Sequence, residues 1–184
     1  DKAMSDASTN DRVKASMTRA RAYLDGAYAR GELVGHQAPE LNFTWTNFSG
    51  DNQPTKLSDL KGKVVVLDFW ATWCGPCVVS FPQVRDLVKA YEGYDVVVLG
   101  VTSLQGSSTK WENGRPVGRE DTTDNPEKEY ELMKEFVTSL NMTWPVAFST
   151  QEVFNPDYGV RGIPHVAIID ANGVVRHRGL HPAS

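Results

Sequence analysis

The sequence predicts an α/β fold, and three of its features lead to this prediction. Residues 64–70 form an apolar, β-branched run of the kind found in buried strands. Residues 78–88 then repeat apolar side chains at helical spacing, and residues 95–101 form a second β-branched run. A strand, a helix and a strand in this order predict a right-handed crossover between two parallel strands. Further along, Asn172-Gly173 stands between two more β runs, which predicts an antiparallel hairpin.

The composition is that of a globular chain stabilised by a packed core. The chain has 184 residues, of which 40% are hydrophobic and 23% charged, and this length suits one domain with extensions. Its net charge of -4 gives no reason to expect nucleic-acid binding, and two cysteines cannot form a disulfide framework. No apolar run is long enough to span a bilayer and no signal peptide is visible, so membrane association is not visible in the sequence.

The chain is expected to divide into an N-terminal tail and amphipathic helix, residues 1–34, and a domain at residues 35–184. Residues 1–9 are small and polar, which predicts a loose segment. The helix is expected over residues 10–30, with Gly31 as its stop. Its apolar stripe is expected either to pack on its own domain or to contact a partner or a second copy.

The domain contains two features beyond the parallel pair. Residues 41–46 predict a strand, and residues 55–57 are expected to pair back with it across a turn at 49–54. Residues 103–125 form a polar insertion that is longer than an ordinary connection. Because the preceding strand ends beside the cysteines, the insertion is expected to be a lid or partner-selecting loop, or else a disordered decoration. A helix is expected at residues 126–140.

The two cysteines lie where the first predicted strand leads into the first helix of the domain. A helix N-terminus has free N–H groups and a positive dipole end, and both stabilise an anionic sulfur. Cys74 is therefore the candidate nucleophile, and Cys77 is the candidate thiol that resolves the resulting mixed disulfide. Their spacing allows a disulfide, with Gly75 and Pro76 setting the turn between the two sulfur atoms.

Three other side chains are candidates for a role near the sulfur atoms. Asp68 stands in an otherwise apolar strand, where burial raises the pKa of a carboxyl group. It is expected to accept the proton of Cys77, and the alternative is an exposed strand-end carboxylate without a role. Trp73 offers a flat apolar surface beside Cys74 or else packs in the ordinary way. His165 is expected either to tune the sulfur atoms or to point into solvent.

No metal site or cofactor is expected. One CxxC motif supplies two of the four ligands that a structural zinc site needs. The haem-attachment pattern fails because Val78, and not histidine, follows Cys77.

Two stretches resemble the thioredoxin superfamily. Residues 66–77 are similar to its active-site segment, and residues 158–164 are similar to the segment that carries its cis-proline. Residues 35–41 and 57–63 and the Ala71-Thr72-Trp73 spelling are similar to the TlpA/ResA-like branch.

The resemblance implies a thioredoxin fold, with three α/β/α layers and a mixed central sheet, to which the N-terminal helix and the β-hairpin are extensions. It implies a cis Ile163-Pro164 bond, with Pro164 against the disulfide and the backbone of Ile163 pairing with a bound peptide. The family's closing helix has no counterpart here. Either the chain is truncated, or another element, such as the N-terminal helix of the same or a neighbouring subunit, covers that patch. Asp68 stands where this branch commonly has Asn.

The resemblance also implies an activity and partners. It points to a thiol–disulfide oxidoreductase of the periplasm or another extracytoplasmic space, acting mainly as a reductant of protein disulfides and supplied by an upstream electron donor protein. Apocytochromes, as in cytochrome c maturation, or copper-site assembly factors are the partners it suggests. The alternatives are a thiol peroxidase, whose cysteine motif is not found, and a non-catalytic module that binds copper or staples a loop. The expected catalytic residues are Cys74, Cys77 and Asp68. The expected substrate-binding residues are Trp73, Gly75, Pro76, Ile163 and Pro164.

Overall fold

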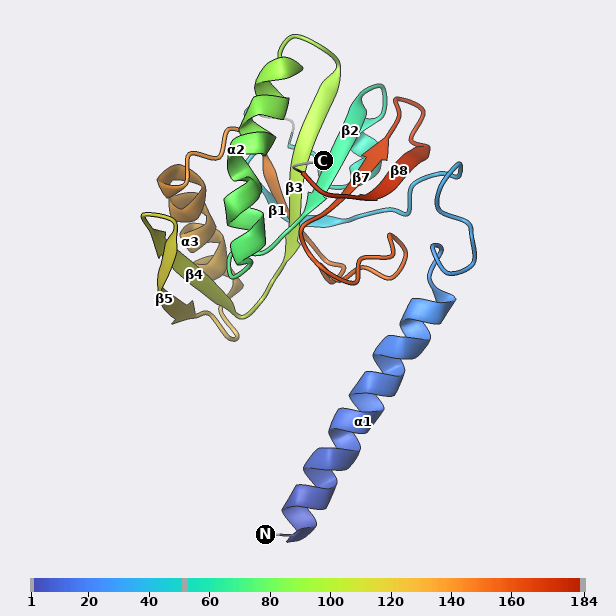
Figure 1. The fold of residues 1–184 in the computed structure, drawn as a ribbon, viewed down its shortest axis with the longest axis vertical. Coiled ribbons are helices and arrows are strands. Elements are labelled where there is room, and N and C mark those ends of the chain that lie inside the picture. Colours follow the sequence, from blue (N-terminus) through green and yellow to red (C-terminus); the bar gives the residue numbers. More distant parts are fainter. Residues whose placement is uncertain (1, 51–52, 183–184) are drawn as a thin grey trace.

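The computed structural model describes residues 2–50 and 53–182, with side chains from residue 10 onward. A six-stranded mixed sheet with strand order β1-β6-β3-β2-β7-β8 lies at its centre (Figure 1). Its strands are β1 (Phe43–Thr46), β2 (Val64–Phe69), β3 (Val96–Ser103), β6 (Val146–Ser149), β7 (His165–Ile169) and β8 (Val175–Leu180). A second sheet consists of β4 (Ser107–Glu112) and β5 (Arg115–Asp121). The helices are α1 (Lys2–Asp25), the 3-10 helix η1 (Leu57–Leu60), α2 (Gly75–Ala90) and α3 (Pro126–Ser139).

The central strands pair as the sequence predicts. β2 and β3 are parallel, with Val64 opposite Val96, and α2 forms the crossover between them. β7 runs antiparallel to β2 and continues into β8 across the turn at Asn172 and Gly173. Gly173 adopts a φ of 81°, a conformation that favours glycine. The mixed sheet places the ends of β2 and β3 and the start of β7 at one edge, where α2 begins.

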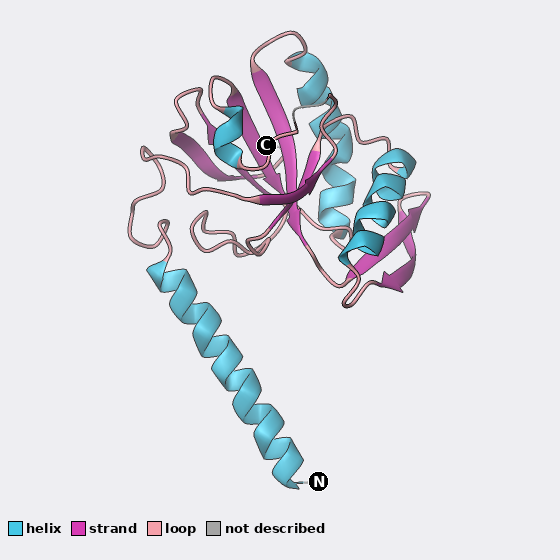
Figure 2. Ribbon diagram, turned by 180° about the vertical axis from the view of Figure 1, so that it is seen from behind, coloured by secondary structure: helices cyan, strands magenta, loops and turns pink. Residues whose placement is uncertain are grey.

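Two apolar clusters cover the two faces of the sheet. On one face α2 and α3 pack together through aromatic side chains, among them Phe81 and Phe136, whose ring centroids lie 6.4 Å apart. On the other face η1 and the segments 33–41 and 153–160 cover the strands. Figure 2 shows that loops make up much of this second covering. Burial of these side chains is the main stabilising contribution to the fold.

β1 is an edge strand of the central sheet and pairs antiparallel with β6. The expected pairing with residues 55–57 is present as a bridge between Asn42 and Lys56. The turn predicted at residues 49–54 lies partly outside the described residues.

The N-terminal helix begins and ends earlier in the sequence than predicted. α1 already includes residues 2–9, which were expected to be loose, and it ends at Asp25 rather than near residue 30. The helix ends early at a tertiary contact. Gly26 packs closely on the backbone of Pro156, since a Cβ atom at Gly26 would lie only 2.5 Å from the carbonyl oxygen of Pro156. The next two backbone N–H groups donate to the side chain and the carbonyl of Asp157, at 2.9 and 3.1 Å.

α1 projects away from the rest of the protein (Figures 1 and 2). Val13, Met17 and Leu24 of its apolar stripe are 50%, 67% and 70% exposed. The expectation that the stripe packs on its own domain is therefore wrong, and so is the expectation that this helix covers the sheet patch within its own subunit. The end of α1 contacts the domain, for example through Arg161, which lies over the ring of Tyr23. Across the described residues, no helix combines the length and apolar character that crossing a membrane requires.

The polar insertion at residues 103–125 is an ordered hairpin rather than a disordered decoration. β4 and β5 pair antiparallel around Asn113 and Gly114, which have φ angles of 50° and 73°. Two positive φ angles in succession are typical of a hairpin turn and favour the Asn-Gly pair. β4 packs against α3, so the hairpin lies beside the helical layer (Figure 1).

Candidate active site

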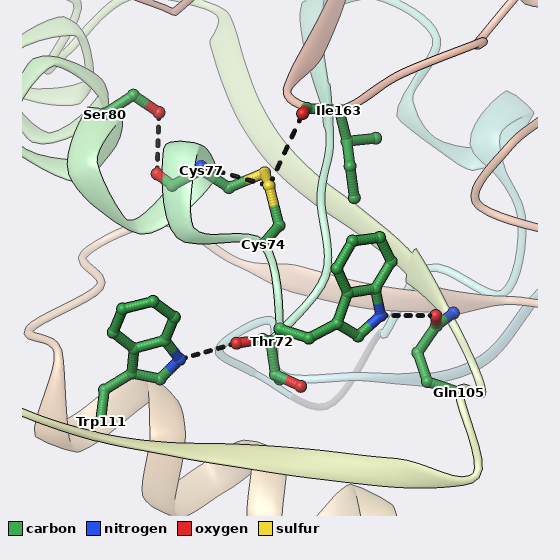
Figure 3. The surroundings of a disulfide bond; sticks show 8 residues. Thr72, Cys74, Cys77, Ser80, Gln105, Trp111 and Ile163 are labelled. Carbon is green, nitrogen blue, oxygen red and sulfur yellow. Dashed lines mark hydrogen bonds between the residues drawn. A yellow bond between two sulfur atoms is a disulfide. The ribbon is translucent and has the colours of Figure 1, made fainter. Parts of the chain in front are cut away.

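The two cysteines form a disulfide at the start of α2, with their Cα atoms 5.3 Å apart (Figure 3). Cys74 is the N-cap residue, and its Sγ accepts the backbone N–H of Cys77 at 3.2 Å. An N–H group aimed at Sγ favours an anionic sulfur there in the reduced protein. Cys74 is 3% exposed and Cys77 is 0% exposed. Both cysteines are therefore buried in the oxidised protein, and of the two only Cys74 keeps any exposed surface.

The loop that leads into β7 faces the disulfide. The Ile163-Pro164 bond is cis, as the resemblance implied. The carbonyl oxygen of Ile163 points toward Cys74, with 3.7 Å between the oxygen and Sγ (Figure 3). The structure thus brings together two sequence segments, 74–77 and 163–164, that the chain separates widely.

The other three predicted binding residues surround the same position. Trp73 lies at the surface and is 40% exposed, so it is not an ordinary core residue. Pro76 is exposed in the first turn of α2, and Gly75 is half-buried. Gly75 lies beside the hairpin, and a Cβ atom there would be in ordinary contact with the ring of Trp111, at 3.6 Å.

The β4–β5 hairpin holds the segment just before Cys74, and sequence reasoning missed this contact. Trp111 donates its indole N–H to the carbonyl oxygen of Thr72 at 2.7 Å (Figure 3). The backbone N–H of Thr109 donates to the hydroxyl oxygen of Thr72 at 3.2 Å. The same Asn-Gly signal that predicted the β7–β8 turn occurs at residues 113–114 and could have revealed the hairpin. Nothing in the sequence indicates that its tryptophan reaches Thr72.

Asp68 is buried on the sheet face that α2 covers. It is 2% exposed, and neither carboxylate oxygen has a hydrogen-bond partner among the described residues. Burial raises the pKa of Asp68 to about 7. The exposed strand-end alternative is therefore wrong. Asp68 lines a cavity of about 310 Å³ together with apolar side chains of β2, β3 and α2, among them Val66 and Val84. Its action on the proton of Cys77 remains a prediction.

His165 follows the cis-proline but does not point into solvent. It is 6% exposed, its ring packs edge-on against Phe69, and its Nε2 accepts the backbone N–H of Gly179 at 3.3 Å. Burial, and to a smaller extent the charge of Arg178, lowers the pKa of His165 to about 4. The imidazole is therefore neutral at neutral pH, and its bond to β8 fixes the start of β7.

The described part of the chain contains no group of three or more His, Cys, Asp or Glu side chains that could hold a metal ion. The chemistry that its geometry offers is that of the sulfur pair.

Comparison with known proteins fits this geometry. The family model for Redoxin matches residues 33–184. The chain belongs to the Redoxin family. Within this family it is a TlpA/ResA-like member of the thioredoxin superfamily and a thiol–disulfide oxidoreductase.

Three similar proteins illustrate the relationship. Thioredoxin-like protein YneN of Bacillus subtilis is 31% identical over 79% of this chain and 71% of its own length. Thiol-disulfide oxidoreductase ResA of Oceanobacillus iheyensis is 28% identical over 77% of this chain, which spans only 62% of that ResA. The crystal structure of a thiol:disulfide interchange protein DsbE from Chlorobium tepidum is 31% identical, with a TM-score of 0.53 over 80% of this chain and 84% of that one. The predicted fold, family and enzyme class are confirmed.

Proposed function

We propose that this redoxin reduces disulfide bonds in partner proteins, with Cys74 as the attacking residue. The observation that carries the proposal is the asymmetry of the disulfide at the start of α2. Cys74 keeps some exposed surface and faces the carbonyl of Ile163, whereas Cys77 is fully buried. A partner sulfur can therefore approach one cysteine, and the other is kept for the second step.

The reaction consists of two exchanges that move one electron pair. In the reduced protein the Cys74 thiolate attacks one sulfur of the partner disulfide, whose S–S bond breaks and releases a thiolate. The Cys77 thiolate then attacks the sulfur of Cys74, which breaks the mixed disulfide and releases the partner as a dithiol. The protein is left with the Cys74–Cys77 disulfide seen here, and an upstream dithiol protein restores the reduced pair.

The partner segment binds across the disulfide in an extended conformation. Its backbone pairs with Ile163 in the manner of an added strand, and Pro164 packs against the sulfur atoms. Trp73, Gly75 and Pro76 form the other side of the binding surface. Their exposure or partial exposure beside Cys74 supports this assignment.

Asp68 accepts the proton of Cys77 in the second exchange. A carboxyl group with a pKa of about 7 exchanges protons readily at neutral pH. The absence of hydrogen-bond partners for it among the described residues, and the cavity it lines, support a proton-transfer role over a structural one.

The location and partners extend the proposal by resemblance. The relation to ResA and to DsbE favours action outside the cytoplasm, in the periplasm or an equivalent space. Apocytochromes and copper-site assembly factors fit as disulfide-bearing partners, with a dithiol protein as electron donor.

Turnover of a disulfide-bonded peptide by the reduced protein tests the proposed function. With excess dithiol, the protein should reduce many equivalents of peptide, and its potential should lie below the glutaredoxin range of about -200 to -230 mV. A potential near that of DsbA, about -120 mV, would instead assign it as an oxidant. Rapid loss of hydrogen peroxide would favour the thiol peroxidase alternative, and stoichiometric copper binding without dithiol turnover would favour the non-catalytic one.

A further inference from the structure

Two aromatic rings stand exposed beside the reactive sulfur. Trp73, next to Cys74 in the chain, stacks on Phe154, with 6.2 Å between the ring centroids and 26° between their planes. Phe154 is 43% exposed and Trp73 is 40% exposed. Phe69 and Trp70, which also lie near the cysteines, are by contrast buried. An exposed apolar pair at a reactive centre is typical of a surface that binds a partner.

Uncharged polar groups hold the indole of Trp73 and the backbone just before Phe154. The indole N–H of Trp73 donates to Gln105 Oε1 at 2.9 Å (Figure 3). The amide of Gln105 in turn donates to the hydroxyl oxygen of Ser103, at 2.9 Å. The same hydroxyl oxygen accepts the backbone N–H of Val153, the residue before Phe154, at 3.0 Å. Ser103, which is 5% exposed, therefore links the two segments that carry the rings.

This arrangement prepares the aromatic pair for binding. Because the polar edge of the indole is already hydrogen-bonded, what the pair offers a ligand is mainly its apolar surface. Because Ser103 and Gln105 hold the supporting segments, little side-chain freedom is lost when a ligand binds. The Cα atoms of Trp73 and Cys74 are about 3.8 Å apart, the spacing of neighbouring residues. A side chain one or two residues from the partner's cysteine is therefore within reach of the pair.

We infer that Trp73 and Phe154 form a subsite that selects partner proteins carrying an aromatic or other large apolar side chain next to the cysteine that Cys74 attacks. This inference rests on the proposed function and adds a substrate preference to it. Phe154 is the new specificity-determining residue, and it comes from a segment far from the cysteines in sequence. Gln105 and Ser103 act as positioning residues for the subsite.

The experiment uses two cyclic disulfide peptides that are identical except for Phe or Ser beside the cysteine to be attacked. The rate constants of the reduced full chain with each peptide give a selectivity ratio. The parent should react about tenfold faster with the Phe peptide, because aromatic contacts contribute on this scale. Phe154→Ala should lower this ratio to about one, and Phe154→Trp, which restores a ring, should keep it.

A second exposed aromatic pair provides a matched control. Tyr91 and Tyr94 lie at the opposite end of α2, and their ring centroids are also 6.2 Å apart. Tyr94→Ala should leave the ratio unchanged. Equal parent rates with the two peptides, an unchanged ratio in Phe154→Ala, or an equal loss in Tyr94→Ala would each overturn the subsite while leaving the exchange reaction intact. A parent that reacts with neither peptide would overturn the proposed function itself.

Discussion

The carbonyl oxygen of Ile163 lies 3.7 Å from the Sγ of Cys74. The redox-active sulfur is therefore in contact with the backbone of a loop that comes from the other end of the chain. A partner strand that pairs with this loop would bring its own cysteine against Cys74, which is the geometry that exchange requires.

Asp68→Asn should slow the second exchange more than the first. In the proposed mechanism the carboxylate takes the proton of Cys77, so its removal should affect release of the mixed disulfide, whereas attack by Cys74 should not need it. In the parent the release rate should rise with pH up to about 7, where Asp68 becomes ionised, and this limb should be missing in the variant. Rapid-mixing kinetics of both steps from pH 5 to 9 provides the measurement. Equal slowing of the two steps would argue against proton transfer by Asp68.

The same substitution should change how stability depends on pH. The pKa of Asp68 rises from an ordinary value of 3.8 to about 7 in the folded protein because the side chain is buried, so folding favours the protonated form. The stability of the parent is greatest below pH 4 as far as this group is concerned, and it falls as pH rises to about 7. The loss amounts to roughly 4 kcal/mol at most, at about 1.4 kcal/mol per pKa unit.

Asn cannot ionise, so Asp68→Asn should not show this decrease. Urea unfolding of the oxidised parent and variant gives the free energy of unfolding of each protein at pH 4 and at pH 8. The free energy of the parent should fall between these two pH values by more than that of the variant. Curves that stay parallel over this range would mean that Asp68 is ionised at low cost.

Trp111→Phe should destabilise the protein more than Trp73→Phe. Both changes remove one indole N–H donor, but Trp111 donates to the carbonyl of buried Thr72 and Trp73 donates to the partly exposed Gln105. An acceptor left unpaired in the interior costs about 1–3 kcal/mol, whereas an exposed one can bind water. Denaturant midpoints of the two variants give the comparison. Equal losses would show that the hairpin does not anchor the active-site segment.

Gly100→Ala should be strongly destabilising, and Gly118→Ala should not be. A Cβ atom at Gly100, in β3, would lie 2.7 Å from Nε1 of Trp70 and 3.2 Å from Nε1 of Trp144. Overpacking of this kind costs about 1–3 kcal/mol. A Cβ atom at Gly118, in β5, would meet nothing within 4 Å, so the change should be neutral or slightly stabilising. Thermal unfolding of both variants tests the pair, and comparable changes in Tm would contradict the packing around Gly100.

The sequence predicted the parts of the fold that local patterns specify. The β-branched runs at β2 and β3 and the turn at Asn172-Gly173 have strong short-range signals, so these elements lie close to their predicted limits. The CxxC motif and the proline segment likewise identified the reactive centre, because its chemistry is concentrated in a few neighbouring residues.

The remaining features depend on contacts between distant segments. α1 ends at Asp25 because Gly26 meets the backbone of Pro156, and no local pattern records that contact. The stacking of Phe154 on Trp73 likewise joins two separate loops and has no signature in the sequence. The burial of Asp68 was foreseen from its apolar neighbours, since burial in a strand follows from the residues around it.

Trapping of the mixed disulfide tests the central claim most directly. Reduced Cys77→Ser and Cys74→Ser variants are mixed with a disulfide-bonded peptide, and the adducts are located by mass spectrometry. Cys77→Ser should accumulate one peptide per chain on Cys74, because the second exchange cannot occur, and Cys74→Ser should accumulate far less on the fully buried Cys77. Equal trapping by the two variants, or trapping mainly on Cys77, would contradict the assignment of Cys74 as the attacking residue.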